Sequence, residues 1–124
     1  MTAPVTLYPG GRLPPDATAG WLPAALAELT HAPTGHSGLG AAAATLSPGD
    51  AGGAQCYPAG DALLVVLGGQ LAIEFGPGLA TTVVAAAGDA VAIASGTVHR
   101  ERHGGGNAPV RFLRIAPGGP ALPA

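Results

Sequence analysis

Charged residues are scarce in this chain, and lysine is absent. Aspartate, glutamate, lysine and arginine together make up 10% of the 124 residues, and the formal net charge is −2. Nucleic acids and anionic membrane surfaces are held by fields of positive charge, which this composition does not supply. We therefore expect neither nucleic acid nor a membrane among its partners.

Cysteine and long apolar segments are also nearly missing. Cys56 is the single cysteine, which excludes an internal disulfide and fits a reducing compartment. No apolar run reaches the roughly 18 residues of a membrane helix. Residues 1–12 lack the basic start and apolar run of a signal peptide. These features predict a cytoplasmic protein, and the length suits one domain. The alanine-rich, lysine-free composition is typical of a G+C-rich genome and fits a bacterial secondary-metabolite pathway.

The first third of the chain is irregular. Residues 1–19 carry four prolines and predict an extended arm with one short strand over 5–7. Residues 21–29 have the spacing of about two helical turns. Residues 30–40 read as a loop that carries His31 and His36.

From residue 39 onward, short apolar segments alternate with glycine- and proline-rich turns. This pattern predicts an all-β sandwich or barrel, and the absence of a long helical segment disfavours parallel βαβ units. The predicted strands cover residues 40–46, 54–57, 62–67, 70–75, 81–86, 90–94, 98–102 and 110–115.

The strand that opens near residue 99 carries an unusual set of side chains. Because side chains alternate between the two faces of a strand, His99, Glu101 and His103 share one face, while Arg100 and Arg102 share the other. A face with two imidazoles and a carboxylate suits a ligand site more than an apolar core.

Glycines and polar residues recur at a fixed spacing in two stretches. The first contains Gly49, residues 55–57, Asp61 and Gly68. The second contains Gly88, residues 94–96, His99 and His103, and the segment 108–115 follows as a closing strand.

These frames resemble the two motifs of the cupins, which are small β-barrels with a ligand or metal site inside. The resemblance covers residues 39–115. It implies a conical double-stranded β-barrel, or jelly roll, over 39–116, preceded by the proline-rich arm, short helix and loop of 1–38 and followed by a flexible tail over 117–124. Cupins commonly pair, so it also implies a homodimer.

The positions that bind metal in many cupins are substituted here. The resemblance places Gln55, Tyr57, Asp61 and His99 at those positions, and only His99 is the usual residue. Gln and neutral Tyr are weak metal ligands, so we expect no cofactor. An oxygen-rich site for Fe or Mn, less so for Zn, stays open, with Gln55, Asp61, His99 and His103 as its ligands.

The same residues suit proton transfer to or from a small, neutral, largely apolar organic substrate. His99 can take or give a proton near neutral pH, and Asp61 or Glu101 can fix its tautomer. Tyr57 and Gln55 can donate hydrogen bonds to a developing oxyanion. The predicted catalytic residues are therefore His99, Tyr57, Asp61 and Gln55, with His103 and Glu101 as substrate-binding residues, and the predicted reaction is an isomerisation, cyclisation or lyase step.

Two other functions remain open. The first alternative is a ligand-binding cupin without catalysis. The second is a metal-dependent oxygenase with a rearranged ligand set. Both stay open because the fold alone does not determine the function. Simple structural roles also stay open: Tyr57 as a barrel-filling aromatic, Asp61 as a turn stabiliser, Glu101 paired with Arg100 or Arg102, and Cys56 as a buried apolar residue.

Overall fold

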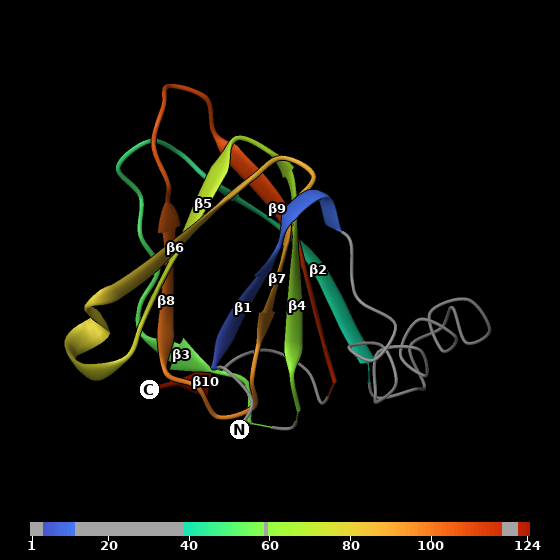
Figure 1. Ribbon diagram of the computed structural model, residues 1–124, viewed down its shortest axis with the longest axis vertical. Helices are drawn as coiled ribbons and strands as arrows, with labels where there is room; N and C mark the ends of the chain where they lie inside the picture. The colour runs from blue at the N-terminus through green and yellow to red at the C-terminus, as the bar shows by residue number, and fades with distance from the viewer. Residues whose placement is uncertain (1–3, 12–38, 59, 118–121) are drawn as a thin grey trace.

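The computed structural model describes residues 4–11, 39–58, 60–117 and 122–124. They form two antiparallel five-stranded sheets that face each other (Figure 1). The first sheet has the order β1 (Val5–Tyr8), β7 (Ala90–Ile93), β4 (Ala62–Gly68), β9 (Val110–Pro117) and β2 (Leu39–Leu46). The second has the order β10 (Leu122–Pro123), β3 (Gln55–Cys56), β8 (His99–His103), β5 (Gln70–Phe75) and β6 (Thr81–Ala86).

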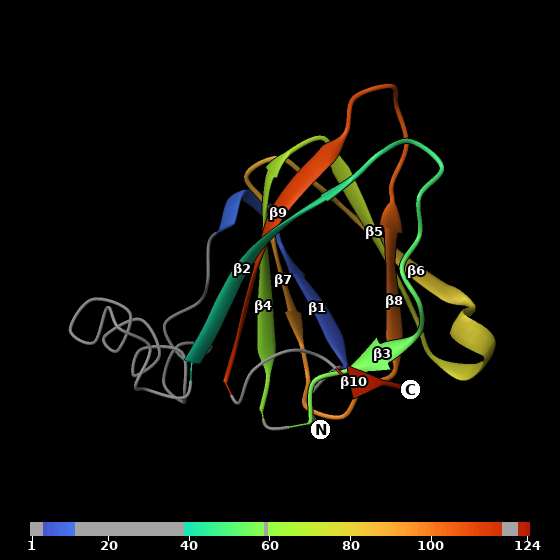
Figure 2. The same ribbon diagram turned by 180° about the vertical axis from the view of Figure 1, so that it is seen from behind.

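The hydrophobic core is made of side chains from both sheets. The two sheets also face each other in the view from behind (Figure 2). The core forms because alternate residues of each strand turn inward. On β9, for example, Val110 and Phe112 are fully buried, whereas Arg111 between them is exposed. The main core residues are Leu64, Val66, Leu71, Ile73, Val91, Ile93, Val110 and Phe112.

The all-β prediction is confirmed, and most strand boundaries agree within two residues. The strands over 70–75 and 81–86 match at both ends. The short strand predicted over 5–7 is β1, which pairs with β7 of the same chain. The predicted helix over 21–29, His31 and His36 lie outside the described residues. In the part of the chain that is described, no helix is long and apolar enough to cross a membrane.

The C-terminal end differs from the expected tail. Leu122 and Pro123 form β10, which pairs with Cys56 and Gln55 of β3. The two residues are exposed, and the sequence missed them because a two-residue strand has no periodicity. Cys56 beside them is half-buried, not the buried apolar residue that the sequence predicted.

Gly69 connects β4 to β5 at a point where the chain has no room for a side chain. Its φ is +77°, and a Cβ there would lie 2.5 Å from the carbonyl oxygen of Pro109 and 2.8 Å from Cα of Val110. The hairpin therefore packs directly on the backbone at the start of β9.

We predict that Gly69→Ala lowers the free energy of unfolding by about 3 kcal/mol or more, because backbone strain and a backbone clash act together. Gly78→Ala is the matched control: its φ is +65°, but nothing lies within 4 Å of the added methyl group, so a loss of about 1 kcal/mol is expected. Urea unfolding measures both, and equal losses would contradict the packing role of Gly69.

Candidate functional site

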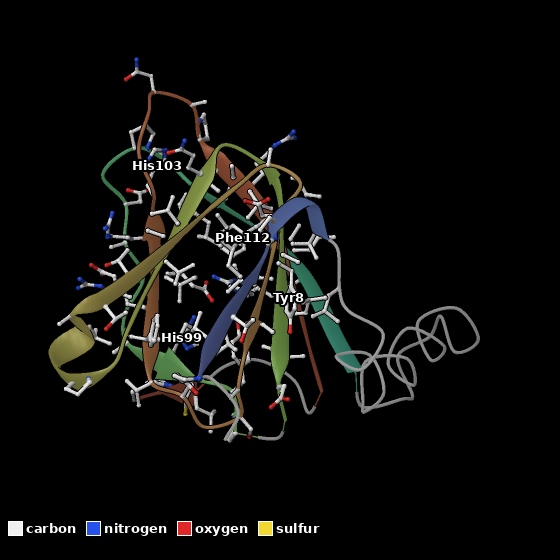
Figure 3. The ribbon with its side chains drawn as sticks, in the orientation of Figure 1. Tyr8, His99, His103 and Phe112 are labelled. Carbon is white, nitrogen blue, oxygen red and sulfur yellow. The ribbon has the colours of Figure 1, made fainter. Side chains whose placement is uncertain are left out.

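Four polar side chains meet inside the barrel. His99 and Glu101 come from β8, Arg114 comes from β9 of the facing sheet, and Tyr57 directly follows β3. His99 is 0% exposed and Glu101 is 1% exposed, which is rare for a charged residue. Figure 3 shows His99 near one end of β8 and His103 near the other.

The alternation of β8 places this cluster in the interior. His99, Glu101 and His103 are buried, whereas Arg100 and Arg102 are partly exposed. This is the division that the sequence predicted. The two arginines contact Glu74 on the outer face of β5, so the expectation that one of them pairs with Glu101 is wrong.

Glu101 is the centre of the cluster because all three other side chains contact its carboxylate. Nε and Nη2 of Arg114 donate hydrogen bonds to Oε1, with Nε at 2.8 Å. The other oxygen, Oε2, accepts from the Tyr57 hydroxyl at 3.3 Å and lies 3.4 Å from Nε2 of His99. Every lone-pair region of the buried carboxylate therefore has a partner.

The ion pair with Arg114 keeps Glu101 ionised. Burial alone would raise the pKa of Glu101, but the hydrogen bonds and charges of His99 and Arg114 outweigh burial, so that its pKa is lowered. For Arg114, burial would lower the pKa, yet the hydrogen bond and charge of Glu101 raise it. The barrel thus holds a permanent ion pair.

Tyr57 stays a neutral hydrogen-bond donor in this environment. Burial is the main cause that raises the pKa of its phenol well above the ordinary value, and the charge of Glu101 raises it further. Its ring stacks on the imidazole of His99, with centroids 5.5 Å apart and planes at 19°. The stacking fixes the plane of the imidazole.

Both ring nitrogens of His99 face acceptors. Nδ1 lies 3.1 Å from the carbonyl oxygen of Thr97, to which it can only donate, and Nε2 faces the Glu101 carboxylate. A single ring proton on Nδ1 leaves Nε2 as the unprotonated nitrogen of the neutral imidazole. Oε2 of Glu101, the oxygen nearest this nitrogen, also accepts from the Tyr57 hydroxyl.

Gln55 lies next to the cluster, as predicted. It is directly opposite His99 in the pairing of β3 with β8, so the two side chains share one face of the sheet. It is partly buried, which leaves its amide beside the cluster rather than at its centre.

Asp61 and His103 have other roles. Oδ1 of Asp61 accepts a hydrogen bond from the backbone N–H of Ser95 at 2.9 Å and so fixes the turn before β8. His103 lies four residues beyond His99, roughly 13 Å along the strand at about 3.3 Å per residue. It donates from Nε2 to the Ala108 carbonyl and accepts from the Gly105 N–H, which holds the loop after β8. The structure therefore does not bring Asp61 and His103 together with His99.

Arg114 is the site residue that the sequence reasoning missed. The signal was the alternation of β9, because Arg114 has the same parity as the buried Val110 and Phe112. An arginine on an inner face needs a partner of opposite charge. Glu101, on the inner face of β8, supplies this charge.

Solved structures share this fold, although their sequences differ widely from this chain. No protein-family model matches this sequence, and no curated protein resembles it significantly. Among solved structures, a Klebsiella pneumoniae protein with a double-stranded beta-helix domain matches with a TM-score of 0.61 and 22% identity, over 71% of each chain. A cupin 2 domain-containing protein from Halorhodospira halophila matches with a TM-score of 0.62 and 17% identity, over 76% of this chain and 63% of that one.

The oxalate decarboxylase of Bacillus subtilis also matches, with a TM-score of 0.61 and 19% identity. The match covers 70% of this chain and 24% of the decarboxylase, so this chain spans about a quarter of that enzyme. The chain has the cupin fold. Identities of this size show the fold alone and carry no information about a reaction.

Among the described residues, the donor set does not fit a divalent metal. Protein metal sites use three or four side-chain ligands, and the described residues hold no group of three or more His, Cys, Asp or Glu side chains placed to bind one. His99 and Glu101 supply two donors, Tyr57 stays protonated, and the guanidinium of Arg114 puts a fixed positive charge beside Glu101. The expected ligand set of Gln55, Asp61, His99 and His103 is not assembled.

We predict that Glu101 makes folding stability depend on pH. Its folded-state pKa lies below its unfolded value of about 4.3, so its contribution is complete above the unfolded pKa and is lost as the pH falls through the folded pKa. The difference in unfolding free energy between the native protein and Glu101→Gln should therefore narrow as the pH falls from about 5 to about 3. Urea unfolding across this range measures it.

Glu74→Gln is the control for this titration. The pKa of Glu74 is lowered by hydrogen bonds from Arg100 and Arg102, but that cluster faces solvent, where ion pairs are screened. The unfolding free-energy difference between the native protein and Glu74→Gln should therefore change less with pH than that of Glu101→Gln. A difference for Glu101→Gln that stays constant with pH would show that the carboxylate is not ionised in the folded protein.

Proposed function

We propose that this cupin is an acid/base enzyme that moves a proton next to a carbonyl group of a small organic substrate, in an isomerisation, cyclisation or lyase step. The observation that carries the proposal is the buried pair of His99 and Glu101, whose facing atoms lie 3.4 Å apart. A buried imidazole beside an ionised carboxylate is a common arrangement for a general base.

His99 is the proposed general base, acting through Nε2. When Nε2 takes a proton from the substrate, the imidazole becomes positively charged, and the negative charge of Glu101 stabilises it. Thr97 holds Nδ1 through its carbonyl oxygen, so the ring stays oriented while the proton moves. The same nitrogen then returns the proton to another atom of the substrate.

Tyr57 is the proposed donor to the oxygen that becomes negatively charged. Its raised pKa keeps the proton on the phenol, so it acts as a hydrogen-bond donor and not as a base. Its present bond to Glu101 is 3.3 Å, longer than the usual O–H···O range of about 2.5–3.0 Å, and is therefore exchanged for a substrate oxygen at little cost. Gln55, on the same face as His99, is the second proposed donor.

The surroundings of the cluster support a mostly apolar substrate. Leu64, Val66, Leu71, Ile73 and Phe112 belong with Tyr57 to one buried apolar cluster. Such side chains favour hydrocarbon parts of a ligand, while the few polar groups fix its orientation.

We predict that the native protein accelerates exchange of C–H hydrogens next to the carbonyl in one or more members of a panel of small ketones and oxo acids in D₂O, read by proton NMR. His99→Gln should lose at least about 10²-fold of this rate, because general acid/base catalysis contributes that much. Arg100→Gln, on the outer face, should keep the native rate. Equal exchange by the native protein and His99→Gln would reject His99 as the base.

A metal-dependent reaction is the alternative that most needs a test, because oxalate decarboxylase of Bacillus subtilis, a structural neighbour, has Mn(II) centres. We predict that elemental analysis of this protein finds well below one Mn or Fe per chain and that EDTA leaves the exchange rate unchanged, since the donor set is poor. Loss of exchange on chelation that one added metal restores would overturn the proton-transfer proposal and favour the oxygenase.

A further inference from the structure

We infer that Arg114, which is partly exposed beside the buried cluster, binds a carboxylate group of the ligand, so that the ligand is a mostly apolar organic acid. The inference depends on the proposed function only for the position of the ligand, beside His99 and Glu101. It revises the neutral ligand that the sequence alone led us to expect.

The guanidinium of Arg114 is only half used by Glu101. An arginine has five N–H groups in one plane, arranged along a side edge and an end edge. Nε and Nη2, which form the side edge, both donate to the same oxygen, Oε1 of Glu101. Within the described residues, Nη1 donates no hydrogen bond, so the end edge formed by Nη1 and Nη2 is open to a second acceptor.

The exposure of the two partners shows where this open edge leads. Glu101 is 1% exposed, whereas 34% of the Arg114 side chain is exposed. One face of the guanidinium is covered by the ring of Phe112, with Cζ 5.1 Å from the ring centroid. Among the described residues, no buried side-chain nitrogen lacks a hydrogen-bond partner, so Nη1, which donates none, is accessible to solvent.

A ligand that reaches His99 past Arg114 must compensate for the water it displaces from this edge. A neutral, purely apolar ligand would strip water from charged N–H groups and replace it with nothing, which is costly. A carboxylate matches the edge with two parallel N–H···O bonds, the geometry in which arginine binds carboxylates best. The guanidinium would then lie between the Glu101 carboxylate and the ligand carboxylate and neutralise part of both charges.

The position of Arg114 also serves the proposed reaction. Loss of a proton next to a carbonyl places negative charge on the substrate, and a guanidinium bound to the same molecule stabilises that charge in the transition state. Arg114 thus takes the electrostatic role that a metal ion has in other sites, with a charge that needs no external ligand.

The test compares two probes of equal size, isobutyrate and isobutyramide, by NMR titration of the native protein and of three variants. We expect isobutyrate to bind the native protein and Arg100→Gln equally and at least about tenfold more tightly than isobutyramide. Arg114→Gln should lose this preference for the carboxylate. Arg114→Lys, which keeps the charge but not the planar edge, should lose most of it. No binding of isobutyrate to the native protein, or an unchanged preference in Arg114→Gln, would overturn the inference.

Glu101→Gln separates this inference from the proposed function and guards against a misfolded arginine variant. It leaves Arg114 in place and removes the competing carboxylate, so isobutyrate should bind at least as tightly as to the native protein, while hydrogen exchange is lost. Weaker isobutyrate binding in this variant would overturn the inference. Retained exchange with unchanged carboxylate binding would instead reject the acid/base role of Glu101 and leave Arg114 as a ligand-binding residue.

Discussion

The ion pair between Glu101 and Arg114 is the interaction on which the polar part of the barrel interior depends. It crosses from β8 to β9 and so connects the two sheets through a polar contact inside an otherwise apolar core. Removing either partner would leave an uncompensated charge in the barrel, which typically costs several kcal/mol. Replacing both with apolar residues of similar volume would be tolerated much better. The ionic character of the pair is therefore more than stability alone requires, which agrees with the proposed role of Glu101 in the reaction.

The arrangement around this pair divides the site into fixed and adaptable contacts. The contacts of Arg114 with Oε1 are short and charge-assisted, whereas those of Tyr57 and His99 with Oε2 exceed 3.2 Å. The fixed half orients the carboxylate. The adaptable half contains the two groups that the proposed mechanism uses, because a group that exchanges partners during a reaction should not be held tightly before it.

Most of the fold followed from the sequence, whereas only part of the site did. Alternation and glycine-rich turns define the strands because each residue's face is set locally. The same rule placed His99 and Glu101 inside. It did not reveal which cation faces Glu101, because Arg114 is in another sheet and contacts across a core depend on how two sheets pack, which no local pattern encodes. Asp61 and His103 match the motif spacing, but their side chains form hydrogen bonds with nearby backbone groups.

The β3 strand gives the wall of the site an uneven stiffness. It has two residues, meets β8 through the single register pair of Gln55 and His99, and has only the short, exposed β10 on its other side. By contrast, β4 and β9 belong to the opposite sheet, where each runs alongside long partner strands. Few main-chain hydrogen bonds must break for β3 to shift. We therefore expect local opening of the barrel at the segment that carries Gln55 and leads into Tyr57. The segment that carries Gln55 is thus held by fewer strand-pairing contacts than the strand that carries Arg114.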